Sequence, residues 1–203
     1  MSIVFYWHPN SSASPIASAL AELDVPHERV RIDIKAGEQR RPEFLALNPN
    51  GVVPTLTVDG APMFEALAIH LWLAERHGVD RGLWPAAGTP ERLQAMSWCT
   101  WAYVSYGAAF WSLNLAIRGE SGAHNEALAQ QSLARLDQLL AVLDGHLAGR
   151  PWMLGASYSL ADLVVGSVLR YSVFLGAPVA SHPRVQAWLD KVTARPAMQL
   201  EQG

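Results

Sequence analysis

A stretch rich in glycine and proline, residues 80–90, separates two parts of the chain whose apolar residues follow different patterns. Its glycines and prolines are Gly82, Pro85, Gly88 and Pro90. These residues interrupt helices and strands, so the stretch is expected to be a linker. Before it, strand-like and helix-like runs alternate, and after it only helical patterns are found. The sequence therefore predicts an α/β domain over residues 1–79 and an all-helical domain over residues 91–203.

The first part predicts elements in the order βαβαββα. The expected strands are residues 3–7, 30–34, 55–58 and 61–64. Between the last two, Asp59-Gly60 has the turn chemistry that hairpins prefer. Ser14 and Pro15 suit the cap and first turn of the first helix. Apolar residues in 67–78 predict a buried helix after the hairpin.

The second part predicts a bundle of helices. The expected helices lie near residues 91–118, 125–148, 159–174 and 183–194. Ser159 and Asp162 have the spacing of a capping box at the start of one of them, in which each side chain pairs with the other residue's backbone. We expect this pair to have a structural role.

The composition excludes several classes of protein. The chain of 203 residues is half apolar and carries a net charge of −3, which provides no basic face for nucleic acid. Its one cysteine, Cys99, cannot form an internal disulfide, a CxxC redox pair or a cysteine-based zinc cluster. The seven histidines show no metal-ligand spacing, so no metal is expected. The N-terminus lacks the features of a secretory signal, and no apolar run is long enough to span a membrane. We therefore expect a cytoplasmic protein.

Two segments of the first part carry a recognisable motif. They are residues 36–56, which end in Asn-Pro-Asn-Gly-Val-Val-Pro-Thr-Leu, and residues 64–75, which begin Phe-Glu-Ala-Leu. Both resemble the signature of the cytosolic glutathione transferases, most closely the bacterial, serine-type members. Residues 159–162 resemble the capping box of the family's helical domain. The resemblance implies a thioredoxin-like N-terminal domain that binds glutathione, an all-α C-terminal domain and a homodimer.

The resemblance also implies a binding site for glutathione. A cis bond between Val53 and Pro54 would let the backbone of Val53 pair with the cysteinyl part of the tripeptide. From Pro54 alone, an ordinary proline at the start of a strand would be the simpler interpretation. Glu65 and the backbone of Ala66 would receive the γ-glutamyl group at the start of a helix. The family usually has serine where this chain has Ala66, and the missing hydrogen bond to a charged group is worth roughly 1.5–3 kcal/mol.

Gly51 and Leu67 also depart from the family, because several classes carry polar or basic side chains at these two positions. Gln39 and Arg40 are the expected substitutes, reaching the glycyl carboxylate of the tripeptide. A solvated surface is the alternative role for this charged stretch.

The candidate catalytic group is a hydroxyl in the loop after the first strand. The glutathione thiol has a pKa of about 8.5, and a donated hydrogen bond stabilises its thiolate. Ser11 is the first candidate, Ser12 the second and Tyr6 the third, while plain loop residues are the alternative interpretation of both serines. Ala13 stands where the serine-type motif has a cysteine, which argues against thiol transfer through a protein mixed disulfide.

The helix after the linker is crowded with aromatic residues. We expect Tyr103, Tyr106 and Phe110 to line a pocket for an apolar substrate, and Trp98 and Trp101 to pack against their neighbours. The predicted activity is addition of the glutathione thiolate to an apolar electrophilic small molecule, as in detoxification. Isomerase, dehalogenase and peroxidase activities use the same thiolate and stay open. The alternatives from other classes are a non-catalytic binding or regulatory module with the same fold and, third, a thioredoxin-like disulfide reductase.

Overall fold

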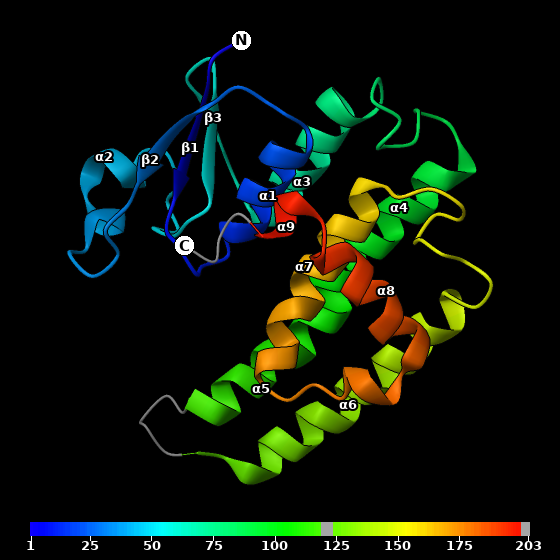
Figure 1. Cartoon of the computed structure of the whole chain (residues 1–203). Helices are drawn as coiled ribbons and strands as arrows, with labels where there is room; N and C mark the ends of the chain where they lie inside the picture. Colours follow the sequence, from blue (N-terminus) through cyan, green and yellow to red (C-terminus); the bar gives the residue numbers. More distant parts are fainter. Residues whose placement is uncertain (119–123, 200–203) are drawn as a thin grey trace. The chain divides into compact units, whose positions relative to one another are not determined.

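The computed structural model describes residues 1–118 and 124–199, and these form two compact units (Figure 1). The first consists of Met1–Trp84 and the short helix α9 (Pro196–Gln199). The second consists of described residues within Pro85–Arg195. The first unit is the predicted thioredoxin-like α/β domain and the second is helical, which confirms the expected fold class.

The first unit is built on a four-stranded sheet in the order β2-β1-β3-β4. Its strands are β1 (Ile3–Trp7), β2 (Glu28–Arg31), β3 (Thr55–Val58) and β4 (Ala61–Phe64). β1 runs parallel to β2 and antiparallel to β3, and β3 and β4 form the predicted hairpin. Asp59 and Gly60 adopt positive φ values of 49° and 85° in its turn, as expected for Asp-Gly.

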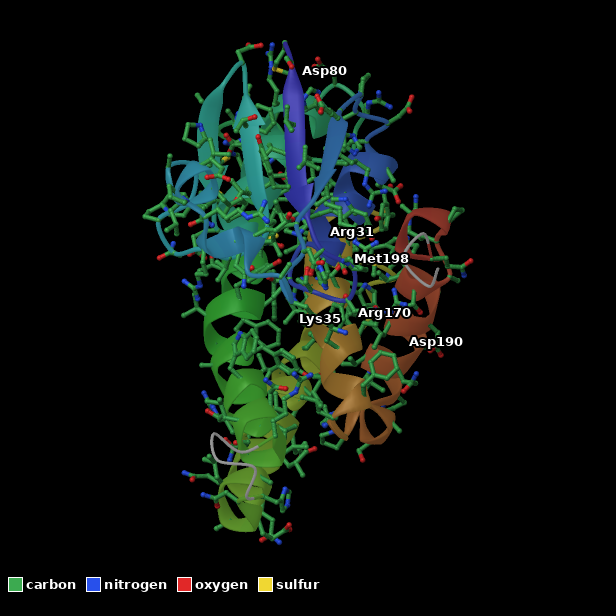
Figure 2. The ribbon with its side chains drawn as sticks, turned by 90° about the vertical axis from the view of Figure 1, so that its left-hand side faces the viewer. Arg31, Lys35, Asp80, Arg170, Asp190 and Met198 are labelled. Atoms are coloured by element: carbon green, nitrogen blue, oxygen red, sulfur yellow. The ribbon has the colours of Figure 1, made fainter. Side chains whose placement is uncertain are left out.

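Helices pack against both faces of this sheet (Figure 1). They are α1 (Ser14–Glu22), the 3₁₀ turn η1 (Glu38–Arg40), α2 (Pro42–Leu45), α3 (Ala66–Leu73) and the π-helical turn η2 (Ala74–Gly78). α1 packs against α3 and α9, whose Met198 is buried (Figure 2). α2 lies on the other side of the sheet.

Two local details differ from the sequence-based expectations. α1 begins at Ser14 itself, so the Ser14 hydroxyl does not cap the helix and has no hydrogen-bond partner among the described residues. β2 ends at Arg31, and Asp33 then accepts hydrogen bonds from the N–H groups of Lys35 and Ala36, which turn the chain. Ile32 and Ile34 of the predicted strand therefore lie outside β2.

The second unit contains the expected long helices. They are α4 (Pro90–Trp101), the π-helical turn η3 (Ala102–Tyr106), α5 (Gly107–Arg118), α6 (Glu126–His146), α7 (Leu160–Phe174), the 3₁₀ turn η4 (Val179–Ser181) and α8 (Pro183–Thr193). The N–H of Arg92 donates to the capping Thr89 hydroxyl at 3.3 Å. None of the helices described by the structure is both long and apolar enough to cross a membrane.

Asp162 connects several elements of the second unit from a fully buried position. Its carboxylate accepts hydrogen bonds from the N–H and hydroxyl of Ser159 at 2.9 and 3.0 Å, which confirms the capping box. It also accepts from the Met153 N–H at 2.7 Å and from the Trp188 indole at 2.8 Å. Burial raises the pKa of this carboxyl, while the four donors favour its charged form.

Candidate functional site

Three chain segments converge at one end of the sheet in the first unit. Tyr6 near the end of β1 and Phe64 at the end of β4 are both in register with Thr55, the first residue of β3. The loop after β1, the Val53-Pro54 bond and Glu65 therefore all adjoin this end. The register thus brings together three groups that the sequence spaces far apart.

The loop before β3 presents an unpaired backbone group. The Val53-Pro54 bond is cis, as the resemblance implied. The N–H of Val53 donates no hydrogen bond to any residue that the structure describes. The carbonyl of Val53 accepts a hydrogen bond from the Ser12 hydroxyl at 2.8 Å.

Asn48 holds this loop in shape and was not identified from the sequence. Its amide donates to the Val52 carbonyl at 2.7 Å and to the Thr55 hydroxyl at 3.1 Å, and its oxygen accepts from the Asn50 N–H at 3.0 Å. The side chain is buried, which is unusual for an asparagine. The available signal was a polar residue directly before Pro49 in a segment leading to a buried strand.

The two candidate serines are in different surroundings. The hydroxyl of Ser11 donates to the His8 carbonyl at 2.6 Å and accepts from the Ala13 N–H at 3.1 Å, so it stabilises its own turn. Ser12 is exposed and its hydroxyl is directed to Val53, forty-one residues away in sequence. The ring of Tyr6, the third candidate, packs edge-on against Phe44 with 6.0 Å between centroids.

Glu65 lies at the start of α3 with an unusual backbone conformation. Its φ of 71° and ψ of 114° are rarely adopted by residues other than glycine, and such outliers cluster at functional sites. Among the described residues, the N–H groups of Ala66, Leu67 and Ala68 donate no hydrogen bond, since they form the first turn of the helix. Unpaired N–H groups and the positive end of the helix dipole make this corner suited to a carboxylate.

Arg40 occupies the space beside Gly51. Its guanidinium donates to the Asn50 carbonyl at 3.2 Å. A Cβ atom on Gly51 would lie 2.7 Å from Nη1 of Arg40 and 2.9 Å from the carbonyl oxygen of Gln39. Gly51 also has a φ of +61°. The side chain of Arg40 can therefore take this position because residue 51 has no side chain.

Gln39 lies on the same turn and carries an unsatisfied acceptor. Its amide nitrogen donates to the Ile34 carbonyl at 3.3 Å. Its amide oxygen is buried without a hydrogen-bond partner among the described residues. Gln39 and Arg40 thus both lie beside Gly51, in the loop that leads to Val53; Arg40 is exposed, whereas the amide oxygen of Gln39 is buried.

The aromatic residues of the second unit divide into two groups. Trp98 packs on Trp101 with centroids 5.2 Å apart and on His146 at 4.3 Å, and both indole side chains are half-buried. Tyr106 differs from the expectation of a pocket residue, since it is fully buried and its hydroxyl is 2.7 Å from that of Ser172. Burial raises its pKa to about 12.

Tyr103 and Phe110 are half-buried, and a pocket role for them stays a prediction. Burial raises the pKa of the Tyr103 hydroxyl, which keeps it protonated. Tyr103 lies within η3, and π-helical turns inside long helices are frequent at functional sites.

The comparisons identify the family. Residues 1–75 match the family model "Glutathione S-transferase, N-terminal domain", and residues 125–191 match "Glutathione S-transferase, C-terminal domain". The chain belongs to the glutathione S-transferase family. The transferase is 29% identical to Glutathione S-transferase GstB from Escherichia coli, with 97% of this chain and 96% of GstB covered.

Two further proteins show the range of activities among similar proteins. The transferase is 28% identical to the E. coli Disulfide-bond oxidoreductase YfcG, over 96% of this chain and 92% of YfcG. A crystal structure of a glutathione transferase from Burkholderia graminis, with two glutathione molecules per subunit, is 29% identical with a TM-score of 0.85. That comparison covers 100% of this chain and 90% of the other.

The cysteine of the transferase is not placed for redox chemistry. Cys99 is fully buried, and burial raises the pKa of its thiol, so the reactive thiolate is disfavoured. The motif position occupied by Ala13 offers no second thiol. In the part of the chain that the structure describes, no group of three or more His, Cys, Asp and Glu side chains could hold a metal ion.

Proposed function

We propose that this transferase binds glutathione along the backbone of Val53 and adds its thiolate to a small apolar electrophile. One observation carries the proposal: the N–H of Val53 is unpaired among the described residues, next to a carbonyl that accepts a hydrogen bond from the Ser12 hydroxyl. An extended peptide pairs with such a backbone in the manner of an added strand. The glutathione-bound relative from Burkholderia graminis supports the same ligand.

The two ends of the tripeptide have matching groups nearby. The γ-glutamyl carboxylate would accept from the N–H groups at Ala66 and Leu67, while its ammonium would pair with Glu65. The glycyl carboxylate would pair with Arg40, with Gln39 beside it. Pro54, through its cis bond, shapes the loop that carries Val53. In this arrangement the sulfur lies near the loop after β1.

The activating hydroxyl is then the one that can reach the sulfur. The geometry favours Ser12 over Ser11, because Ser12 already contacts Val53 and Ser11 is held by His8 and Ala13. When the cysteinyl N–H of glutathione donates a hydrogen bond to the carbonyl of Val53, it displaces the Ser12 hydroxyl. That hydroxyl then becomes available to donate to the thiolate. The thiol proton passes to solvent, and the sulfur forms a bond to the electrophilic carbon as the leaving group departs.

The apolar electrophile needs a site of its own. Tyr103 and Phe110 are the proposed wall of the apolar substrate site. Detoxification in the cytoplasm remains the expected setting.

A homodimer is proposed on a separate observation. Several exposed apolar residues lie on the consecutive helices α4, η3 and α5. They are three to eight residues apart, a spacing that places them on one helical face. They are Leu93, Met96, Val104, Trp111 and Leu115. A long exposed apolar stripe of this kind is typical of a protein interface, and a second copy of this chain is the proposed occupant.

Disulfide reduction is the second candidate, favoured by the similarity to YfcG. The buried Cys99 and the alanine at residue 13 leave no protein thiol for it. Any such activity would therefore use the thiols of two bound glutathione molecules, which become oxidised glutathione as the substrate disulfide is reduced.

Calorimetry and two assays test these functions. Heat of association with glutathione, together with turnover of 1-chloro-2,4-dinitrobenzene, would support the proposal. Glutathione-dependent reduction of hydroxyethyl disulfide without conjugation would favour the second candidate. Binding without either activity would favour a non-catalytic module, and no heat at millimolar glutathione would overturn the binding site itself.

A further inference from the structure

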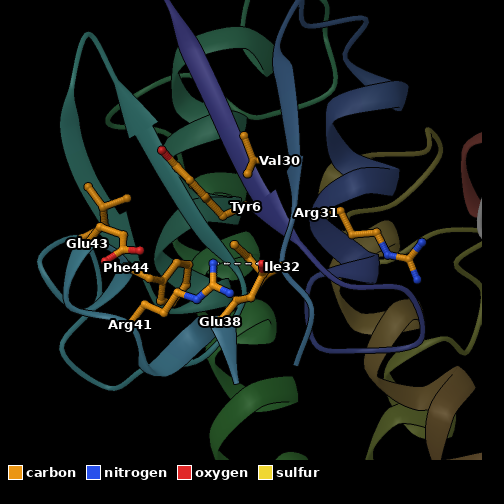
Figure 3. Close-up of a pocket in the computed structure, with 9 residues that line it drawn as sticks. Tyr6, Val30, Arg31, Ile32, Glu38, Arg41, Glu43 and Phe44 are labelled. Atoms are coloured by element: carbon orange, nitrogen blue, oxygen red, sulfur yellow. Dashed lines mark ion pairs between the residues drawn. The ribbon is translucent and has the colours of Figure 1, made fainter. Parts of the chain in front are cut away.

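A groove of about 350 Å³ lies in the first unit between the sheet and α2 (Figure 3). Its apolar lining comes from Tyr6, Val30, Ile32, Phe44 and Leu47. Tyr6 and Val30 are neighbours in register on β1 and β2, so their side chains share this face of the sheet. Because α2 is only four residues long, it covers this face incompletely.

The groove has an aromatic corner. Phe44 of α2 is buried and meets the half-buried ring of Tyr6 edge-on. The Tyr6 hydroxyl makes no hydrogen bond with any described residue. Aromatic faces attract organic cations through their negative π-surface.

The charged residues at the rim differ in whether they are paired. Arg41 pairs with Glu38 at 3.2 Å, and the same Glu38 carboxylate accepts the N–H of Asp33 at 2.8 Å (Figure 3). Glu43 is exposed and has no ion-pair or hydrogen-bond partner among the described residues. Arg31 also lines the groove and has no ion-pair partner among the described residues, but its guanidinium is directed away from the other three groups in Figure 3. The unpaired charge on the α2 side of the groove is therefore the Glu43 carboxylate.

We propose that this groove is a second binding site, separate from the glutathione site, for a small organic ammonium ion with an apolar body. The ammonium pairs with Glu43, and the apolar body lies on Val30 and Leu47 beside the ring of Tyr6. The volume is in the range of small-molecule pockets, roughly 300–1,000 Å³. An anionic ligand is disfavoured on the α2 side of the groove, because Glu43 repels it and Arg41 is already paired with Glu38.

The site is independent of the proposed glutathione contacts. None of the groove's lining residues is Ser12, Val53, Glu65 or Ala66. A ligand in the groove should therefore bind with or without glutathione present.

The test uses 2-phenylethylammonium as probe and 3-phenylpropionate as its anionic counterpart. Protein NMR titration should show saturable binding of the cation, with shifts at Val30 and Leu47 that saturating glutathione leaves in place. Glu43→Gln should weaken this binding at least fivefold. Glu28→Gln, which removes an exposed carboxylate on β2 outside the groove, should leave it unchanged.

Each other outcome would overturn the proposal. The site would be ruled out if the cation did not bind, if glutathione displaced it, or if Glu43→Gln bound it equally well. Tighter binding of 3-phenylpropionate than of the ammonium would reverse the charge assignment. Circular dichroism of both variants confirms that any loss of binding is not a loss of fold.

Discussion

The hydroxyl of Ser12 donates a hydrogen bond to the backbone carbonyl of Val53 across 2.8 Å. This bond joins the loop after β1 to the residue before the cis-proline. Val53 thus uses its carbonyl while its N–H stays unpaired among the described residues. A peptide ligand that pairs with both groups of Val53 would have to displace Ser12, and the displaced hydroxyl would remain within reach of that ligand.

Ser12→Ala should therefore raise the pKa of the bound glutathione thiol toward its free value of about 8.5. Loss of a hydrogen bond to a charged group corresponds to roughly a 10- to 100-fold lower kcat/KM at pH 7. The pKa is measured from the ultraviolet absorbance of the thiolate during a pH titration of the complex.

Ser11→Ala is the matched control for this prediction. It should lower stability by about 1 kcal/mol, because the Ser11 hydroxyl stabilises the turn that enters α1. It should leave the thiol pKa nearly unchanged. A larger pKa change in Ser11→Ala than in Ser12→Ala would return the catalytic role to Ser11.

Ala66→Ser should increase the affinity for glutathione. The new hydroxyl would lie at the first residue of α3, beside unpaired N–H groups, and would donate to the γ-glutamyl carboxylate. A hydrogen bond of this kind corresponds to about a tenfold lower Kd. Ala68→Ser, two residues further into the helix, serves as control in the same calorimetric titration. Equal affinities for wild type and Ala66→Ser would mean that the carboxylate binds elsewhere.

Gly51→Ala should destabilise the protein and weaken glutathione binding. Its Cβ would clash with Arg40 and with the carbonyl of Gln39, the two residues proposed to hold the glycyl end. Gly37→Ala is the matched control, because Gly37 also has a positive φ of +75° but no atom within 4 Å of the added Cβ. Both variants carry the backbone cost of about 1 kcal/mol, so a lower Tm and a higher Kd in Gly51→Ala alone isolate the clash. Equal effects would contradict the close approach of Arg40.

Local patterns in the sequence predicted most of the fold. The hairpin around Asp59-Gly60 and the long helices follow from residues adjacent in sequence, and the structure has them within a few residues of the expected bounds. The resemblance to a family supplied the cis bond at Val53-Pro54. These features depend on short-range periodicity or on a recognisable motif.

The remaining details depend on contacts between distant residues. The difference between Ser11 and Ser12 arises from the contact of Ser12 with Val53, which adjacent residues do not encode. The fit of Arg40 against Gly51 and the burial of Tyr106 against Ser172 have the same origin. The sequence offered a set of candidates in each case, and tertiary packing distinguishes among them.

Asp162→Ala should lower the free energy of unfolding without changing glutathione affinity. The variant leaves the N–H groups of Met153 and Ser159 and the indole of Trp188 buried without their acceptor. Buried unsatisfied groups cost about 1–3 kcal/mol each, so the total loss should be at least about 3 kcal/mol. Asp190→Ala, at an exposed position on α8, is the control. Retained stability in urea denaturation with a selective loss of glutathione binding would contradict a purely structural role.

His70 should make the protein less stable as the pH falls. Burial within α3 lowers the pKa of this histidine from 6.5 to about 3. The unfolded chain therefore takes up a proton below about pH 6.5, while the folded protein does so only near pH 3. Stability that is present at pH 7 is consequently lost between these values, at up to about 1.4 kcal/mol per pH unit.

Urea denaturation at pH 7 and pH 5 measures this effect. Over those two units the wild type should lose roughly 2 kcal/mol through His70, in addition to the contribution of other groups. His70→Phe removes the titrating ring, so its stability should change less over the same interval. His124→Gln, at an exposed histidine, should keep the wild-type pH dependence. If His70→Phe kept it as well, His70 would have to be protonated in the folded protein near pH 6, which its burial in α3 opposes.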